Sequence, residues 1–368
     1  MPSKKSNTTI QGMPWGFANI WHEGIRSLPE RPLQKRNYIY ASELGQSYRD
    51  RYLKMNAHPY SNPFNERSKC KMLAGNFFES IVGMVLTATG ILHKSQLRGE
   101  VELPGCLKVS GRLDFIAGGA AIDWDKAKHE VEKVKALFEF SVTDMAPFIR
   151  HMVDKVFERF KMMFSYQPIM QYVLECKSVS GFVYQLIERS GKPRQGHPLQ
   201  SLHYLLANKE VPQALLTYIS REDVMMQEFY IDRDKVLMKK YKDDVATMTA
   251  LYNDGVMNYK KHIPPPEPEI QFEEASWRFV KNNKAEYSPY LTETYGYKSI
   301  EEFKDKWAKS ISSWNRTFGR CVTGANMTAL NKAAIQDAKK YFPEWDKLVA
   351  KAKAAGAFQK DDEGGEDD

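Results

Sequence analysis

Residues 172–177 constrain this chain most, because they end an apolar strand with an acid and a lysine two positions apart. Side chains alternate between the two faces of a strand. Leu174 and Cys176 therefore point into a core, whereas Glu175 and Lys177 project together from the other face. A solvated Glu–Lys pair at a strand end is the ordinary explanation of this pattern, so its meaning depends on the rest of the sequence.

Two further acids interrupt apolar segments. Asp114 follows Gly111 by three positions in a predicted strand, and because an unpaired buried aspartate is costly it requires a metal or a basic partner. Glu79 follows Gly75 by four positions in a predicted helix, and a glycine there lets another backbone approach closely. The ordinary alternatives are a salt bridge for Asp114 and an exposed helix face for Glu79.

A helix predicted to begin at Pro198 carries Gln200 and Tyr204, which are four positions apart and so share a face. An ordinary amphipathic helix would also explain this pair.

Composition excludes several classes of protein. With 368 residues, 42% hydrophobic and 27% charged, the chain is typical of soluble globular proteins with one large domain or two ordinary ones. No apolar run approaches the roughly 18 residues of a membrane helix, and the first residues lack the apolar core of a signal peptide. We therefore expect no membrane association and a cytoplasmic location, in the host cytoplasm if the protein is viral.

The charge distribution favours a polyanion as partner. The net charge is +7, but six acids crowd the last eight positions. The first 360 residues carry 53 basic residues against the 40 remaining acidic ones, a net charge of +13. A basic body of this kind is typical of proteins that bind nucleic acid, although many soluble proteins are mildly basic.

Four cysteines occur, without any CxxC pair, so we expect reduced thiols and neither a zinc site nor an iron–sulfur cluster. The sequence also lacks a GxxxxGK[ST] phosphate loop, a GxSxG elbow and an HExxH motif, which leaves kinases, P-loop ATPases, serine hydrolases and zinc proteases without support.

Hydrophobic periodicity and turn residues predict a mixed α/β chain. Predicted helices cover 43–55, 72–86 (a buried helix), 144–164, 198–208, 299–316 and 327–341, and another runs from a cap at Asp232 to about 254. Predicted strands cover 100–103, 107–116, 137–142, 169–177, 182–187, 214–220 and 224–231. Residues 1–37 are expected to form an irregular arm, 263–269 a stiff proline-rich linker and 361–368 a disordered acidic tail.

The order of the polar motifs is more specific than any one of them. A helix with GxxxE, a strand with GxxD, a strand with ExK and a helix with QxxxY follow one another. This order resembles the PD-(D/E)xK nuclease superfamily, in particular its RecB-like and phage lambda-type exonuclease branch. The region around residues 40–51 also resembles the opening of CRISPR-associated RecB-like nucleases. The resemblance spans about 38–231 and leaves the C-terminal third uncovered.

The resemblance implies a metal-dependent hydrolase. Glu79, Asp114 and Glu175 would hold one or two Mg²⁺ or Mn²⁺ ions, with the main-chain carbonyl of Cys176 as a further ligand. Lys177 would orient the attacking water and offset negative charge. Gln200 and Tyr204 would position Lys177 or the DNA backbone.

Two departures from the family pattern matter. Asp114 and Glu175 are 61 positions apart, which implies an insertion at about 118–167. Glu139 competes with Glu175 as the acid of the motif, but Ser141 stands where its lysine is expected. Relatives with an iron–sulfur cluster have one early and three late cysteines, whereas here Ser47 and Trp277 stand near two of those places, so no cluster is expected.

Basic and aromatic residues suggest how DNA is held. Arg49, Arg51, Lys192 and Arg194 are the candidates for contact with backbone phosphates. Tryptophans of the C-terminal third offer stacking surfaces for single strands, unless they simply pack between helices. These residues are Trp277, Trp307 and Trp314, with Arg278 beside the first.

The resulting prediction is a restriction-endonuclease-like α/β core, with a mixed central sheet flanked by helices, over 38–262, and a mainly helical extension over 263–360. Its expected activity is Mg²⁺- or Mn²⁺-dependent exonuclease cleavage at the ends of linear DNA in recombination, repair or replication, with a single-strand-binding or recombination protein as an additional partner. A structure-specific endonuclease and a non-catalytic DNA-binding scaffold are the alternatives. The sequence leaves strand polarity and oligomeric state open.

Overall fold

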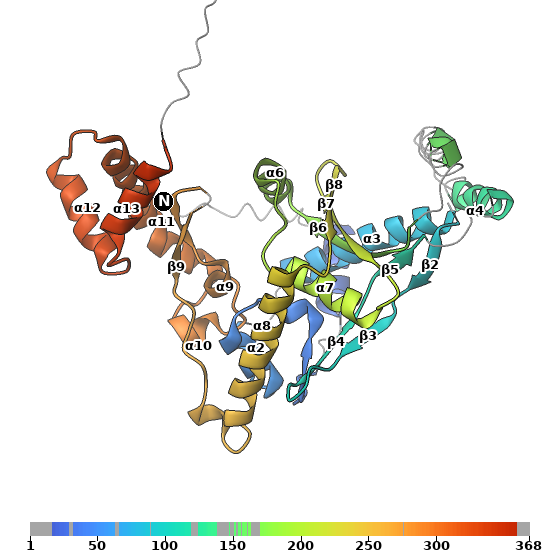
Figure 1. Cartoon of the computed structure of the whole chain (residues 1–368), viewed down its shortest axis with the longest axis horizontal. Coiled ribbons are helices and arrows are strands. Elements are labelled where there is room, and N and C mark those ends of the chain that lie inside the picture. Colours follow the sequence, from blue (N-terminus) through green and yellow to red (C-terminus); the bar gives the residue numbers. More distant parts are fainter. Residues whose placement is uncertain are drawn as a thin grey trace, which may run out of the picture. The chain divides into compact units, whose positions relative to one another are not determined.

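The structure is a computed structural model, shown in Figure 1. It describes residues 17–28, 32–62, 66–88, 90–118, 124–137, 170–274 and 276–358, and from the segment between 138 and 169 only 147, 151, 154, 155, 157–159, 161 and 162. These residues of that segment are helical. Of the strand predicted over 137–142, the structure describes Leu137, which is helical. The rest of that segment with the competing acid Glu139, the remainder of the helix predicted over 144–164 and the acidic tail lie outside the described residues.

The chain divides into two compact units. The first is Met1–Gln46, Lys54–Ala57 and Phe64–His262. The second is Ser47–Leu53, His58–Pro63 and Ile263–Asp368.

The first unit contains two sheets with helices around them. The strands are β1 (Tyr38–Tyr40), β2 (Leu92–Ser95), β3 (Arg98–Val101), β4 (Lys108–Arg112), β5 (Phe115–Ala117), β6 (Tyr172–Val179), β7 (Gln213–Ser220) and β8 (Met226–Ile231). The helices are α1 (Phe17–Arg26), α3 (Glu66–Ala88), α4 (Trp124–Leu137), α6 (Gly181–Ser190), α7 (His197–Ala207) and α8 (Lys235–Asp254), with short 3-10 turns η1 (Ala41–Glu43) and η2 (Tyr259–Lys261). Helix α2 (Tyr48–Met55) has residues in both units.

The larger sheet is mixed, with the strand order β2-β5-β6-β7-β8. Only β6 and β7 are parallel, and the other neighbours pair antiparallel. Helix α3 packs against β6, and its Gly83 brings it close to the ring of Phe115. Helix α7 packs against β3, β6 and β7. The smaller sheet has the order β1-β4-β3. The expected mixed sheet flanked by helices is therefore confirmed.

The prediction of a strand over 182–187 is wrong, because this segment lies in α6. Its β-branched and aromatic residues favour a strand. However, Gly181, Tyr184 and Ile187 are the buried positions, and their spacing of three is that of a helix. Parallel neighbours β6 and β7 need a crossover between them, which is usually helical. The helix ends at Gly191, which adopts φ 58°.

Other predictions need smaller corrections. The arm expected over 1–37 contains helix α1, in which Arg26 pairs with Glu66 of α3 at 3.1 Å. The helix predicted over 43–55 is split into η1 and α2, with Gly45 at φ +71° between them. The N-cap of α8 is Asp234 and not the predicted Asp232. The side chain of Asp234 accepts from the backbone N–H groups of residues 236 and 237, whereas Asp232 accepts from the side chain of Gln213.

Helix α3 is longer than the predicted helix over 72–86 and less buried. Leu86 is buried, but Met72 and Phe77 are 57% and 63% exposed. The sheet covers one side of the helix, so a sequence that is apolar around most of its circumference leaves apolar side chains at the surface. None of the helices described by the structure is long and apolar enough to cross a bilayer.

The second unit is mainly helical, as predicted, and adds a hairpin that the sequence analysis missed. Its elements are β9 (Ile270–Glu273), β10 (Arg278–Lys281), α9 (Asn283–Glu286), α10 (Leu291–Tyr295), α11 (Ile300–Thr323), α12 (Ala329–Lys339) and α13 (Trp345–Ala354). Trp307 and Trp314 are buried in its core, and Trp277 packs against the same cluster. The idea that these tryptophans stack on DNA bases is therefore wrong for Trp307 and Trp314.

Candidate active site

Antiparallel pairing of β5 with β6 brings Asp114 next to the ExK segment. Phe115 is the register partner of Leu174, so Asp114, which immediately precedes β5, lies opposite the next residues of β6. Its Oδ2 accepts a hydrogen bond from the backbone N–H of Cys176 at 2.8 Å. One strand pairing thus brings together Asp114 and Glu175, which are 61 positions apart in the sequence.

Glu175 and Lys177 lie on the same face of β6, as alternation predicts. The Lys177 ammonium forms an ion pair with Oε1 of Glu175. The two neighbouring positions Leu174 and Cys176 face the apolar cluster that includes Leu86 of α3. The strand therefore separates an apolar face towards α3 from a charged face on the other side.

Helix α7 supplies the polar residues above this charged face. The side-chain amide of Gln200 donates to Oε1 of Glu175 at 2.7 Å and lies 3.2 Å from the hydroxyl of Tyr204. That hydroxyl donates to the carbonyl oxygen of Arg112 at 2.9 Å. Gln200 therefore orients the carboxylate of Glu175, whereas the sequence analysis expected it to position Lys177 or the DNA backbone.

Close packing against Gly111 fixes Tyr204. A Cβ atom at Gly111 would lie 2.6 Å from Cβ of Ala41 and 2.9 Å from the tyrosine ring. No side chain fits there without a shift of its neighbours. The glycine that the sequence singled out beside Asp114 is thus the place where Tyr204 approaches β4.

Glu175 is the most buried acid of the site. It is 1% exposed, and its second oxygen, Oε2, is buried without a hydrogen-bond partner among the described residues. Burial raises the pKa of this carboxyl, against the opposing effect of Lys177. A buried acceptor that lacks a partner is costly unless a ligand satisfies it.

The pKa values of Asp114 and Lys177 are both raised, but burial acts on the two groups in opposite directions. Burial first and then the charge of Glu175 raise the pKa of Asp114 to about 8, although Lys177 and the Cys176 N–H act against this. Burial tends to lower the pKa of Lys177, but Glu175 and Asp114 outweigh it and the net shift is upward. Lys177 is therefore a permanent ammonium at neutral pH, beside carboxyls that repel one another.

Glu79 lies near Asp114 and Glu175, but its own hydrogen-bond donor is Gln96. Gln96 donates to its Oε1, and its charge contributes to the raised pKa of both Asp114 and Glu175. Within the described parts of the chain, no three His, Cys, Asp or Glu residues are arranged so as to enclose a metal ion. A cation at this site would therefore draw on fewer protein carboxylates and complete its shell with water, as Mg²⁺ usually does.

The donor set fits a hard divalent cation. Oε2 of Glu175 has no partner in the described parts of the chain, and the charges of Glu175 and Glu79 oppose ionisation of Asp114 in the absence of a cation. In a strand, the N–H and C=O of one residue point towards the same edge. The carbonyl of Cys176 thus shares the edge on which its N–H binds Asp114. All of these are oxygen ligands, which Mg²⁺ and Mn²⁺ prefer.

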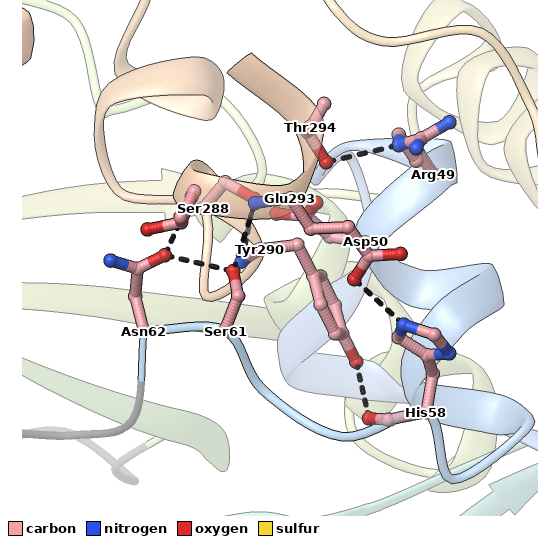
Figure 2. Close-up of polar contacts among 10 residues, drawn as sticks. Arg49, Asp50, His58, Ser61, Asn62, Ser288, Tyr290, Glu293 and Thr294 are labelled. Atoms are coloured by element: carbon pink, nitrogen blue, oxygen red, sulfur yellow. Dashed lines mark hydrogen bonds and ion pairs between the residues drawn. The ribbon is translucent and has the colours of Figure 1, made fainter. Parts of the chain in front are cut away.

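Two of the four residues predicted to bind DNA are engaged inside the second unit, and Figure 2 shows one of them, Arg49, beside Thr294. The Arg49 guanidinium donates to the carbonyl of Pro264 at 2.8 Å and to the hydroxyl of Thr294 at 3.2 Å. Arg51 is fully buried, with its guanidinium 4.6 Å from the centre of the Tyr48 ring. The burial of Arg51 contradicts its predicted role as a surface phosphate ligand, whereas Arg49 is half-buried and its role stays a prediction.

Segments 47–53 and 58–63 are attached to α10 and the residues before it. The hydroxyl of Ser288 donates to Asp50 at 2.8 Å, and His58 lies 2.7 Å from Glu293. The hydroxyl of Tyr290 donates to the carbonyl of His58 at 3.2 Å, as Figure 2 shows. Sequence alone gives no sign of these contacts, because the partners are more than 200 residues apart.

Lys192 and Arg194 are exposed in the turn between α6 and α7. Sequence analysis missed the neighbours of this turn, His197 and Tyr218. The pairing of β6 with β7 could have indicated Tyr218, since it stands opposite Lys177. The thiols of all four cysteines are free.

Comparisons with known proteins give limited information. No protein-family model matches the chain, and no curated protein matches it. A solved structure of a protein designated SSO0001 is 13% identical with a TM-score of 0.35, covering 63% of this chain and 86% of its own. An alkaline exonuclease from Laribacter hongkongensis is 10% identical with a TM-score of 0.34, covering 66% of this chain and 96% of its own. Scores this low do not by themselves establish a common fold.

Proposed function

We propose that this protein is a metal-dependent deoxyribonuclease that hydrolyses phosphodiester bonds at the ends of linear DNA. The observation that carries the proposal is the buried Oε2 of Glu175, which lacks a partner among the residues that the structure describes, while its other oxygen is held by Lys177 and Gln200. The order of the motifs in the sequence, which resembles that of RecB-like and lambda-type exonucleases, supports the same reaction.

Each residue of the site would have a separate role in the reaction. Glu175, Asp114 and the carbonyl of Cys176 would hold one or two Mg²⁺ or Mn²⁺ ions, with Glu79 contributing through water. Such an ion lowers the pKa of bound water and neutralises phosphate oxygens. Lys177 would donate hydrogen bonds to the attacking water and to the phosphate, where negative charge develops. Gln200 holds the carboxylate of Glu175 in one orientation.

Incubation with end-labelled linear DNA and with covalently closed circular DNA tests this function. With Mg²⁺ we expect the wild-type protein to convert the linear substrate to mononucleotides or short products and to leave the circles intact. Glu175→Ala should not cleave DNA with Mg²⁺, and the wild-type protein should not cleave it in EDTA. Nicked or linearised circles would instead support a structure-specific endonuclease. DNA binding without cleavage under any metal condition would support a non-catalytic scaffold.

A further inference from the structure

Helix α7 carries two histidines that each stack on a tyrosine and bond to its hydroxyl. His197 Nδ1 lies 2.8 Å from the hydroxyl of Tyr218, with ring centres 5.6 Å apart. His203 Nδ1 lies 3.0 Å from the hydroxyl of Tyr241, with ring centres 6.2 Å apart. The proposed reaction uses neither pair, and the first is the one that lies beside Lys177.

The first pair lies next to Lys177. Tyr218 is the register partner of Lys177 in the parallel pairing of β6 with β7, so the two side chains point to the same face of the sheet. Tyr218 is fully buried. Burial, followed by the charges of Lys177 and Arg194, lowers the pKa of His197 to about 3. The imidazole is therefore neutral at physiological pH.

The hydrogen bonds around Tyr218 have a defined direction. The backbone N–H of Arg194 donates to its hydroxyl oxygen at 3.0 Å. A tyrosine hydroxyl has one proton to donate, and neutral histidine can accept it at Nδ1. The arrangement that satisfies all three groups runs from Arg194 N–H through Tyr218 O–H to His197 Nδ1.

This chain of bonds ties the basic turn between α6 and α7 to the sheet. The turn begins at Gly191 and ends at Gly196, both with positive φ. A Cβ atom at Gly196 would lie 3.0 Å from the carbonyl oxygen of Leu44, so the end of the turn is packed closely. Between the two glycines, Lys192 and Arg194 are exposed.

We propose that His197 and Tyr218 are positioning residues that fix the turn of residues 191–196, so that Lys192 and Arg194 contact the phosphate backbone of DNA beside Lys177. The proposal rests on the proposed function. Contacts to phosphate set the register of a bound strand. A turn that is ordered before binding loses less conformational entropy when the strand binds, so it binds more tightly.

Tyr218→Phe removes only the hydroxyl, and Tyr241→Phe is its matched control. Trypsin does not cut before proline, so the bond after Arg194 is the cleavable one in the turn. We expect Tyr218→Phe to accelerate cleavage after Arg194 about fivefold or more and Tyr241→Phe to leave it unchanged, with mass spectrometry as the readout. An unchanged cleavage rate in Tyr218→Phe would overturn the proposal.

Kinetics on DNA test the role in binding. Tyr218→Phe should raise KM for DNA about fivefold to tenfold with kcat within about twofold of wild type, and Tyr241→Phe should change neither. In a background that carries both Lys192→Ala and Arg194→Ala, Tyr218→Phe should have no further effect on KM, because both contacts that it positions are already absent. Equal effects in both backgrounds would mean a merely structural role and would overturn the proposal.

The two proposals fail in different ways. If wild-type protein does not cleave DNA, the proposed function fails, and the same variants are then compared by DNA affinity in EDTA. A weaker affinity of Tyr218→Phe together with faster tryptic cleavage would still support the positioning role. Unchanged affinity, or no DNA binding by wild type, would overturn the assignment of Lys192 and Arg194 to DNA.

Discussion

Gln200 donates its side-chain amide to the same oxygen of Glu175 that pairs with Lys177, at 2.7 Å. The carboxylate is thus held through Oε1, while Oε2 is buried and unpartnered among the residues that the structure describes. Rotation of the carboxylate would break two interactions in order to satisfy the second oxygen. A buried acceptor without a partner costs free energy, and a cation on Oε2 would remove that cost.

Metal binding should release a proton and tighten as the pH rises. Without metal, the carboxyl of Asp114 has a pKa of about 8, so it is largely protonated at pH 7. A metal ligand must be deprotonated, which makes the affinity for Mg²⁺ or Mn²⁺ increase between pH 7 and 9. Titration calorimetry in two buffers of different ionisation enthalpy would measure the released proton. An affinity that is flat over this range would contradict Asp114 as a ligand.

Substitutions at the site should abolish cleavage and preserve the fold. Asp114→Asn, Glu175→Ala and Lys177→Ala should each lower the cleavage rate by a factor on the order of 10² to 10³ or more. Asp114→Asn should keep or raise the melting temperature, because it replaces a carboxyl whose ionisation burial and Glu175 oppose, while keeping an acceptor for the Cys176 N–H. DNA binding should persist in all three variants. Glu188→Ala, at an exposed position of α6, is the control and should be fully active.

Glu139→Ala tests which acid belongs with Lys177. Glu175 is the acid that pairs with Lys177, so Glu139→Ala should retain most of its activity, about half or more. The measurement is the initial rate on linear DNA, compared with that of Glu175→Ala. An inactive Glu139→Ala variant together with an active Glu175→Ala variant would show that the motif was placed on the wrong strand.

Local pattern predicted which residues of the site share a face. Alternation in β6 placed Glu175 with Lys177, and the spacing of four in α7 placed Gln200 with Tyr204. Which oxygen Gln200 contacts depends on how α7 packs on the sheet, and no local pattern contains that information.

The errors of sequence analysis have a common physical origin. Residues 182–187 have strand propensity, but the need to connect two parallel strands overrides it. Arg51 appeared to be available for DNA, yet it is buried after distant segments pack. Trp307 and Trp314 stand at helical spacing that fits a core as well as a surface. In each case tertiary packing decided between two alternatives that the sequence left open.

Glu269 should stabilise the second unit. Its Oε2 accepts from the hydroxyl of Tyr297 at 2.5 Å and from the indole N–H of Trp307 at 2.6 Å, and both rings are buried. Glu269→Ala leaves two buried donors without that acceptor and should lower the free energy of unfolding by about 2–4 kcal/mol. Glu274→Ala is the control, because its ion pair with Lys351 is more than half exposed and should contribute less than about 1 kcal/mol. Equal losses in chemical denaturation would contradict the role of Glu269.

Gly111→Ala should impair cleavage through Tyr204. The new methyl group would lie 2.9 Å from the tyrosine ring and 2.6 Å from Cβ of Ala41, so Tyr204 must move and lose its bond to the Arg112 carbonyl. A displacement near 1 Å at such a site costs on the order of 10²-fold in rate, and the strain should cost about 1–3 kcal/mol of stability. Adding Ala41→Gly removes the clash between the two Cβ atoms but leaves the clash with the ring. The double variant should therefore recover part of the melting temperature and little of the activity. Recovery of both together would show that the loss came from general destabilisation, and Gly24→Ala, in open space on α1, should change neither activity nor fold.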